Sequence, residues 1–404
     1  MRWAKLVVLA LIFSYLFIGW SVRERVFQGS SDFISYYTAA RMIRDGQGSA
    51  LYDLARQTFY QDEILSSLHS PNRFSDGLLA YNHPPFEILW YVPLGGLSYI
   101  QAYSVWLLVS AGCFVGGVWQ LIHSTGLKVW AEGKWFLVGS MAYLPVFITL
   151  LQGQDSATLF LFWVLAYHNL KKARDVRAGF WLSLLFQKFQ ILIPTLLILL
   201  LKKRWSVLSG LFGGCLVLLI ISLAVVGVSG LESYLRLLVE MSSWVERKGI
   251  YPSQMHNLRG QFYVLFYIQN PFLANLLTVM ASGALLVLLV KIWRGEWNSN
   301  SKEFDLKFSL LVTISLLVSP HLNFHDLACL LLPGLLVWRL SEERLWTASN
   351  SNLLRVSLIA IGFPVMLATL AVSDLVPIQL SVWGVMVAVF LMTRSLRALA
   401  TRVE

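Results

Sequence analysis

The chain has 404 residues, of which 57% are hydrophobic and only 13% charged, and it carries a formal net charge of +10 with a mean hydropathy of +0.63. A soluble domain has about 45–50% apolar and about 25% charged residues, so this composition excludes a soluble globular protein and predicts a polytopic membrane protein. The basic residues form short clusters between apolar runs and no continuous stripe, which indicates membrane orientation and not nucleic-acid binding.

The first apolar run covers Leu6 to Trp20 and follows two basic residues, Arg2 and Lys5. It resembles a signal peptide, but no small-x-small cleavage site follows it. We therefore predict an uncleaved first span with its N-terminus in the cytoplasm.

Residues 23–81 are more polar than the rest of the chain and predict a folded loop outside the membrane, with short helices over 33–45 and 53–68. The next run, 84–95, begins with two prolines, which suit a first helical turn. About ten residues at about 1.5 Å each cannot cross about 30 Å of hydrocarbon. We therefore expect an interfacial helix there, still on the outer side.

The remaining apolar runs complete a prediction of about twelve transmembrane helices with both termini in the cytoplasm. These runs are 100–122, 135–151, 156–170, 178–188, 190–201, 205–228, 262–293 (its first part interfacial), 306–319, 327–338, 355–372 and 377–393. A later outer loop is expected over about 229–261. This topology places basic clusters such as 171–177 and 202–204 inside, as the positive-inside rule requires.

Several of these runs are too short to cross a membrane alone, and we interpret them as hairpins whose tips lie below the outer surface. The predicted tips are 187–190 and 319–326, and a third polar turn, 152–155, joins two further runs. All three tips fall on the outer side together with Asp32 and the loop 251–261. The topology therefore predicts one recessed polar site that faces outward.

Two charged residues allow two interpretations each. Asp32 is either the N-cap of a helix or a general base that takes a proton from a hydroxyl group. Lys188 lies at a hairpin tip, where a lone cation is unfavourable without a counter-ion. It either binds an anionic ligand or pairs with an acidic side chain.

The other polar residues of the predicted site are equally open. His325 and Asp326 can form an acid/base or phosphate-contacting pair, or a hydrogen-bonded lid on their hairpin. The polar turn suits sugar recognition, but capping is the commoner role for such residues. The outer-loop residues His256, Asn257 and Arg259 are solvated by default.

Cofactor and metal motifs are missing from the sequence. It has no phosphate-binding loop, no dinucleotide fingerprint and no Cys/His metal spacing, and Cys113, Cys215 and Cys329 all lie in apolar runs. We therefore predict neither a cofactor nor a bound metal.

The order of several short motifs resembles a known family. The motifs are Asp32-Phe33-x-x-Tyr36-Tyr37-x-Ala39-Ala40, Tyr81-Asn82-His83-Pro84-Pro85, Gly153-Gln154, the recessed Lys188, and Ser319-Pro320 followed by His325-Asp326. In this order the chain resembles glycosyltransferase family 87, of the GT-C superfamily of polyprenyl-phosphate-sugar-dependent enzymes, from residue 1 to about 340.

The resemblance implies an all-α, GT-C-like membrane protein in which residues 1–404 form a single glycosyltransferase domain. It implies transfer of a hexose, most often mannose, with inversion, from a polyprenyl-phosphate donor to a lipid- or glycan-linked hydroxyl group. The reaction would take place on the extracytoplasmic face of the plasma (inner) membrane. In mannosyltransferases of the family a late motif reads Ser-Pro-x-Ser-Trp-x-His-His, whereas this chain has Leu322, Asn323 and Asp326 at the differing positions.

Site residues follow from the resemblance and the predicted topology together. Asp32 matches the family's catalytic aspartate, and Gly153, Gln154 and Lys188 match its Gly–Gln turn and recessed lysine. We expect the donor phosphate to bind Lys188, His325 and Arg259. We expect the sugar or acceptor to bind Tyr36, His83, Gln152, Gln154, Asp155, His256, Asn257 and Asp326.

Two other functions fit the same span pattern. A transporter or lipid flippase would also have many spans and a buried charge, although the two halves of this chain show no internal repeat. A non-catalytic partner in a membrane assembly would have much the same sequence as an enzyme of the family.

Overall fold

The computed structural model describes residues 2–71, 77–125, 134–342, 348–372 and 376–400. In these segments the chain forms helices and no strand, with only isolated bridges such as Met255–Asn323. The prediction of an all-α polytopic membrane protein is confirmed.

Seven stretches of the described chain are long and apolar enough to cross a membrane, and two bent helix pairs raise the number to at most nine. The stretches are α1 (Arg2–Phe27), α4 (Tyr99–Thr125), α10 (Trp205–Met241), α12 (Pro271–Ile292), η7 (Phe324–Leu330) with α14 (Leu331–Glu342), α15 (Ala348–Ala360) with η8 (Ile361–Val365) and α16 (Met366–Val372), and α17 (Leu380–Ala400). A total of about twelve spans stays a prediction.

Two shorter helices form the centre of the bundle. In α7 (Ser156–Lys171) and α13 (Lys302–Val318) most side chains on every face are buried. Helices that are apolar all round belong inside a protein, so these two are surrounded by the others. The outer helices instead expose apolar side chains such as Phe17, Val279 and Phe390, as lipid contact requires.

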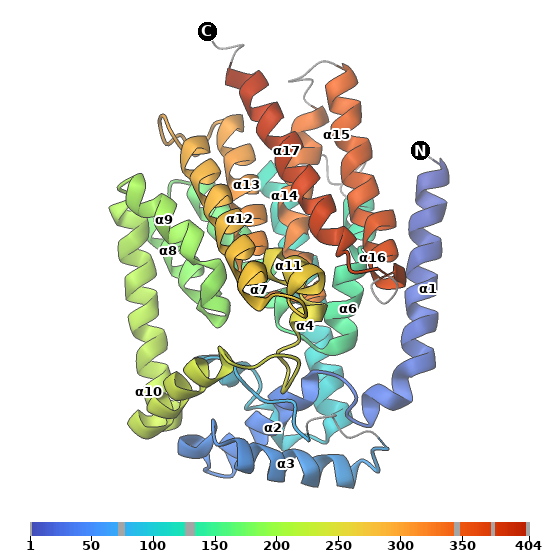
Figure 1. Cartoon of the computed structure of the whole chain (residues 1–404), viewed down its shortest axis with the longest axis vertical. Helices are drawn as coiled ribbons and strands as arrows, with labels where there is room; N and C mark the ends of the chain where they lie inside the picture. Colours follow the sequence, from blue (N-terminus) through green and yellow to red (C-terminus); the bar gives the residue numbers. More distant parts are fainter. Residues whose placement is uncertain (1, 72–76, 126–133, 343–347, 373–375, 401–404) are drawn as a thin grey trace.

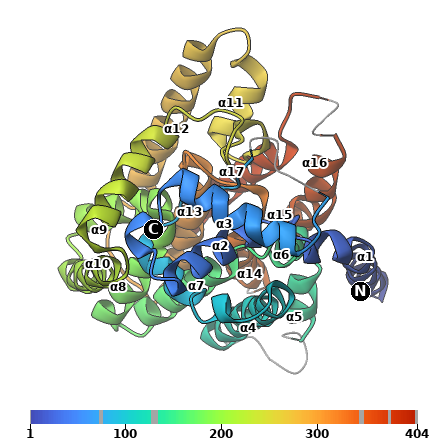
Figure 2. The ribbon, with the colours of Figure 1, turned by 90° about the horizontal axis from the view of Figure 1, so that it is seen from below.

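The polar N-terminal loop lies at the end of the molecule opposite the first turn of α1 and the last turn of α17 (Figure 1). It contains α2 (Phe33–Arg44), η1 (Gly48–Ala50) and α3 (Leu54–Ser67), which confirms the two short helices predicted there. Seen from this end, α2 and α3 lie across the helix bundle, between α10 and α1 (Figure 2).

The interfacial helix predicted over 84–95 is instead two short 3-10 turns, η2 (Pro85–Trp90) and η3 (Leu94–Gly96). Prolines interrupt this segment at 84, 85 and 93 and lack the N–H groups that a continuous α-helix needs. The turns lie against α10 and α2, so this segment packs between the N-terminal loop and the helix bundle.

The first predicted hairpin is present. α8 (Asp175–Ser183) and η5 (Leu184–Ile191) turn by 120° into α9 (Ile193–Leu201). The two ends of the hairpin meet, because the Arg204 guanidinium lies 2.5 Å from the Asp175 carboxylate. Lys188 lies at the turn, with a non-helical backbone (φ −129°, ψ 69°).

The other two predicted turns are also present. α13 and α14 pack against each other, with residues 319–323 and η7 between them. α5 (Lys134–Met141) and α6 (Leu144–Gln152) lead into a turn at Gly153, which precedes α7. Gly153 has a left-handed backbone (φ 65°), and a Cβ atom there would lie 2.7 Å from Cβ of Phe33. Only glycine lets this turn approach α2 so closely.

The second outer loop differs from the prediction. α10 does not end near 228 but breaks at Gly227 (φ 68°, ψ −178°) and continues as a helix to Met241. Beyond η6 (Pro252–Gln254), α11 (Leu258–Phe266) is a separate helix from α12. The first half of the predicted loop 229–261 is therefore helical. Glycine permits the sharp break in α10, after which the helix continues along the end of the molecule that contains α2 and α3 (Figure 1).

Candidate active site

A cavity of about 1000 Å³ lies between the polar N-terminal loop, the end of α10 with the loop that follows it, and the predicted hairpin tips. Its size is at the upper end of ordinary ligand pockets. Nine of the residues predicted for the site line it: Asp32, Tyr36, His83, Gln152, Gln154, Lys188, His256, Arg259 and His325. The three others, Asp155, Asn257 and Asp326, are not in its lining and lie directly behind it or in the adjoining loop.

Asp32 precedes α2 and is partly exposed to the cavity. It occupies the N-cap position, but its backbone is helical and its side chain makes no capping hydrogen bond. Its carboxylate instead accepts a hydrogen bond of 2.6 Å from Nε2 of Gln154, and its backbone N–H donates to the side chain of Gln152. The geometry therefore does not support the N-cap interpretation, and the carboxylate is held across the gap between α2 and the turn before α7.

A series of hydrogen bonds leads from Gln154 along the cavity lining to the buried Glu87. The Tyr36 hydroxyl donates to Oε1 of Gln154 (3.0 Å) and lies 3.0 Å from Nε2 of His83. Nδ1 of His83 lies 2.9 Å from Oε2 of Glu87, which is fully buried. Burial raises the pKa of Glu87 to about 7, although the charge of His83 opposes this shift.

Lys188 is 7% exposed, and its ammonium group contacts two buried carboxylates, Asp326 at 2.5 Å and Asp155 at 3.1 Å. The structure therefore contains the pairing that the sequence left open. Breaking a buried ion pair leaves an uncompensated charge, so these three residues form one ion-paired cluster, in which two carboxylates share a single ammonium group. An ammonium group has three donors, and the third remains for a ligand.

His325 is attached to this cluster directly, with Nδ1 3.2 Å from Oδ1 of Asp326, and also through Ser156. The Ser156 hydroxyl donates to Oδ1 of Asp326 (2.7 Å) and lies 2.9 Å from Nδ1 of His325. A hydroxyl group has one proton to give, so Nδ1 of His325 carries a proton and donates it to Ser156. Nε2 of His325 is buried and has no partner in the described part of the chain.

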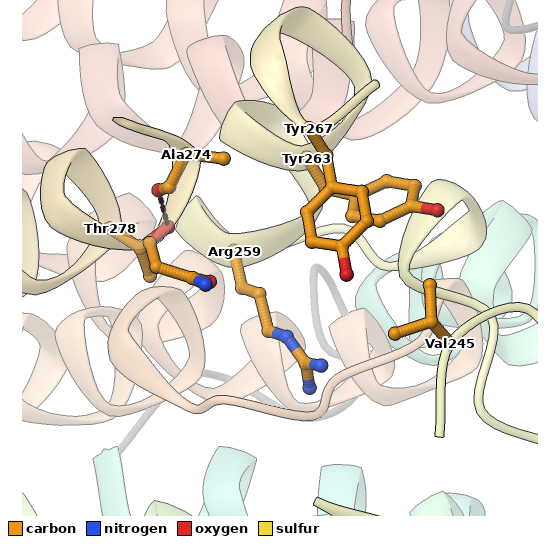
Figure 3. Close-up of a pocket in the computed structure, with 7 residues that line it drawn as sticks. Val245, Arg259, Tyr263, Tyr267, Ala274 and Thr278 are labelled. Carbon is orange, nitrogen blue, oxygen red and sulfur yellow. Dashed lines mark hydrogen bonds between the residues drawn. The ribbon is translucent and has the colours of Figure 1, made fainter. Parts of the chain in front are cut away.

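Arg259 lies at the start of α11 and donates to the backbone carbonyl of Pro320 (3.1 Å). None of the ion pairs between described residues includes it, so its charge is not balanced by a carboxylate. Figure 3 shows its guanidinium group near the stacked rings of Tyr263 and Tyr267, with Thr278 of α12 on the other side. It is therefore the cation of the cavity best placed to receive an anion.

The two neighbours of Arg259 in the loop have different roles. His256 lines the cavity, with Nδ1 2.8 Å from the Ser381 hydroxyl, and burial lowers its pKa to about 3, so it is neutral. Asn257 is fully buried, accepts from the backbone N–H of Gly260 and donates to the carbonyl of Ser319. Asn257 thus caps α11 and holds the two outer loops together.

Comparison with protein-family models supplies the identity: residues 81–320 match the model of glycosyltransferase family 87. The chain belongs to this family. Comparisons with curated proteins and with solved structures found no match. The matched segment includes His83, Gln154, Lys188 and Arg259, whereas Asp32 and His325 lie outside it.

Family membership makes the protein a membrane glycosyltransferase and replaces the transporter and flippase alternatives. Among the described residues, two groups bring possible metal-binding atoms close together: His83 with Glu87 and Asp155, and Asp155 with His325 and Asp326. In the first group Nδ1 of His83 already forms a hydrogen bond with Oε2 of Glu87 (2.9 Å). In the second group the Lys188 ammonium already contacts both carboxylates.

Sequence reasoning missed three polar residues of this glycosyltransferase. Glu87 is the only acid in the apolar segment Pro85–Trp90, and that isolation was the signal that could have identified it. His321 lines the cavity, and burial lowers its pKa to about 3. Ser156 had no such signal, because a serine at the start of a helix is ordinary.

Proposed function

We propose that this glycosyltransferase transfers a hexose from a polyprenyl-phosphate donor to a hydroxyl group of a lipid- or glycan-linked acceptor, with inversion. Mannose is the first hexose to test, from the resemblance described above. The observation that carries the proposal is Asp32, a carboxylate held by Gln154 in the lining of a cavity that Arg259 also lines. A base and an anion-binding group that face one space suit this reaction.

The proposed reaction needs only groups on this chain. Asp32 takes the proton of the acceptor hydroxyl group while the oxygen of that hydroxyl forms a bond to the anomeric carbon of the donor sugar. The bond between that carbon and the phosphate oxygen breaks, and polyprenyl phosphate leaves with the electron pair. Arg259 stabilises the charge that develops on the phosphate, with the third donor of Lys188 and His325 in support.

The remaining polar residues of the lining bind sugar and acceptor in this proposal. Gln152 and His256 offer hydrogen-bonding groups at the cavity wall. Asp155, Asn257 and Asp326 act from behind the lining, by holding Lys188 and the loop before α11. Tyr36, His83 and Gln154 already bond to one another, which limits the donors that they can offer to a sugar.

A transfer assay tests the function directly. Purified protein is incubated with a panel of polyprenyl-phosphate sugars and candidate acceptors, and released polyprenyl phosphate and the anomeric configuration of the product are measured. We expect release that depends on acceptor, with mannose first, and an inverted product. Absence of release with every donor, from protein that is folded and binds donor, would support the non-catalytic assembly role instead.

We also propose that the cavity faces the extracytoplasmic side of the plasma membrane, with both termini and the loop 294–305 in the cytoplasm. Helix α3 and the segment that joins α12 to α13 lie at opposite ends of the molecule (Figure 1). Arg56 belongs to α3 and Asn300 to that segment, and both residues are exposed. After replacement of the three native cysteines, Arg56→Cys should react with an impermeant thiol reagent in intact cells and Asn300→Cys should not. The reverse pattern would invert the topology.

A further inference from the structure

We propose that His83 and Glu87 are a positioning pair that shares one proton and, through Tyr36 and Gln154, holds the Asp32 carboxylate in the orientation needed for proton transfer. The effect on catalysis rests on the function proposed above, whereas the shared proton rests on the hydrogen bonds alone. None of these residues except Asp32 has to touch the acceptor for this role.

The direction of each hydrogen bond in the chain can be assigned, starting at Asp32. Nε2 of Gln154 donates to Asp32, so the amide oxygen of Gln154 points the other way. That oxygen accepts from the Tyr36 hydroxyl. The amide is therefore held at both ends, and it cannot rotate without losing one of the two bonds.

The same reasoning assigns the proton on His83. The hydroxyl of Tyr36 has a single proton, which goes to Gln154. Its contact with Nε2 of His83 at 3.0 Å must then be a bond in which His83 donates and Tyr36 accepts. Nε2 of His83 therefore carries a proton.

A second proton lies between His83 and Glu87. Nδ1 of His83 and Oε2 of Glu87 are 2.9 Å apart, a hydrogen-bond distance. With Nε2 protonated, Nδ1 either carries its own proton and donates it to the Glu87 carboxylate, or accepts from a protonated Glu87. Both forms contain one proton on this bond, so the pair holds that proton whichever atom carries it.

The surroundings favour retention of this proton. Glu87 is 0% exposed, and its other oxygen, Oε1, has no hydrogen-bond partner in the described part of the chain. The titratable or charged groups that face the pair from the packed elements are Asp155, Lys188, Tyr36, Tyr52, Tyr81, Tyr91 and Tyr234, with Asp32 beyond Tyr36. A buried carboxylate without full hydrogen bonding is costly, and Asp155 adds to this cost.

The backbone around the pair is held independently of the proton. The Tyr52 hydroxyl donates to the carbonyl of His83 at 2.7 Å, and Gln57 bonds to both backbone groups of Tyr81. The ring of Tyr91 stacks on that of Tyr36 with centroids 4.4 Å apart. Loss of the proton therefore changes the direction of hydrogen bonds and leaves the rings in place.

Loss of the proton reverses the direction of the hydrogen bonds between Glu87 and Gln154. With Glu87 ionised and His83 neutral, Nδ1–H points to Glu87 and Nε2 becomes an acceptor. The Tyr36 proton then turns from Gln154 to His83, and the oxygen of Gln154 loses its donor. The amide becomes free to rotate away from Asp32, so we expect transfer to fall as pH rises.

The pKa values of the pair are in the range where this change can be measured. Burial raises the pKa of Glu87 to about 7. For His83 burial acts to lower the pKa, but the charge and hydrogen bond of Glu87 outweigh it and raise the value. Both groups therefore favour folding while protonated, and this contribution is lost as pH rises from about 4.5 through about 7.

Glu87→Gln separates positioning from a purely structural role. A glutamine amide can donate to Nδ1 at any pH and so keeps Nε2 of His83 protonated. We expect the ratio of kcat at pH 6.5 to kcat at pH 9 to be at least about fivefold larger in the wild type than in this variant. His83→Phe removes the donor to the Tyr36 oxygen and should lower kcat about tenfold at pH 6.5, about the contribution of one hydrogen bond. In this variant kcat should depend little on pH, and donor KM should change little. Glu232→Gln, at an exposed pair on α10, is the control.

A measurement without turnover tests the proton itself. In protein with ¹⁵N-labelled histidine, the ring nitrogens of His83 are identified as the signals lost in His83→Phe. We expect a protonated Nε2 at pH 6 that loses its proton on alkaline titration in the wild type but not in Glu87→Gln. An unprotonated Nε2 at pH 6 overturns the shared proton, even if transfer is observed.

The two failures are distinguishable. If no sugar donor is used but the Nε2 signal behaves as expected, the proposed function fails and the shared proton stands. If transfer occurs but Glu87→Gln has the same pH profile as the wild type, or if His83→Phe raises KM and leaves kcat unchanged, positioning fails. In the latter case His83 contacts a ligand directly.

Discussion

The two walls of the cavity hold their buried polar side chains by different interactions. The outer wall, from α2 and the segment 81–91, aligns Asp32 through neutral amide and hydroxyl groups and a stack of tyrosine rings. The inner wall, from the hairpin tips, brings full charges together, with Lys188 between Asp155 and Asp326. A buried charge without a partner is far more unfavourable than one near water, so the inner wall pairs its charges, whereas the outer wall leaves Asp32 partly exposed.

This difference indicates separate tasks. A carboxylate that must accept a proton has to remain accessible and free of a cation, as Asp32 is. A lysine that is already paired with two carboxylates adds little long-range attraction for a phosphate. Arg259, which has no carboxylate partner among the described residues, belongs to neither wall and provides that attraction in our proposal.

The largest expected effect is on the outer wall. Asp32→Asn keeps the shape of the side chain but removes the proton acceptor, so transfer should fall by about 10²–10⁴-fold while donor affinity changes little. Turnover of the purified variant measures this. Asp53→Asn is the matched control, because Asp53 caps α3 and asparagine caps about as well. Wild-type turnover by Asp32→Asn would remove Asp32 from the catalytic role.

The inner wall should respond in stability. Lys188→Met leaves two buried carboxylates without their cation, which should lower the free energy of unfolding by about 3–5 kcal/mol. Denaturation in detergent measures the loss, with the exposed Lys172→Met as control. Adding Asp326→Asn should restore part of it, because one uncompensated charge is removed. A stable Lys188→Met with only weaker donor binding would mean that the cluster exists for the ligand and not for the fold.

Arg259 should show the opposite pattern. Arg259→Gln removes a cation that has one carbonyl partner, so stability should change little. A hydrogen bond to a charged group contributes about 1.5–3 kcal/mol, so donor Kd should rise roughly 10- to 150-fold. Titration with a polyprenyl phosphate measures this, and Arg236→Gln on the exposed face of α10 is the control. Unchanged donor affinity would mean that the donor phosphate binds the inner wall, at Lys188, and not Arg259.

The smallest expected effect is at the junction of the walls. Gly153→Ala forces a left-handed backbone on alanine and places its Cβ 2.7 Å from Phe33, which should cost about 1–3 kcal/mol of stability. Gly213→Ala in α10 is the control, because its added Cβ meets nothing within 4 Å. If the turn aligns Gln154, the transfer rate should fall by more than the loss of folded protein explains. A fall only in proportion to that loss would mean that the turn does not align Gln154.

The fold could be predicted from local features. Apolar run length and the distribution of basic residues indicated the membrane class, the hairpin at Lys188 and the polar turns, because span length and charge position are local properties of a sequence. The continuation of α10 beyond Gly227 was missed, since a glycine in an apolar run marks a break but does not say whether a helix resumes.

The candidate site could be predicted only in outline. The sequence by itself determined that rare polar residues would gather at one site, because lipid excludes them elsewhere, and most of them line one cavity. Their common side of the membrane stays a prediction. Only the tertiary structure decided which of them pair: Lys188 with Asp155 and Asp326, Asp32 with Gln154, and His83 with the unremarked Glu87. Hydrogen bonds and ion pairs act over a few ångströms, but Lys188 and Asp326 are 138 positions apart in the sequence, and no local pattern specifies such a contact.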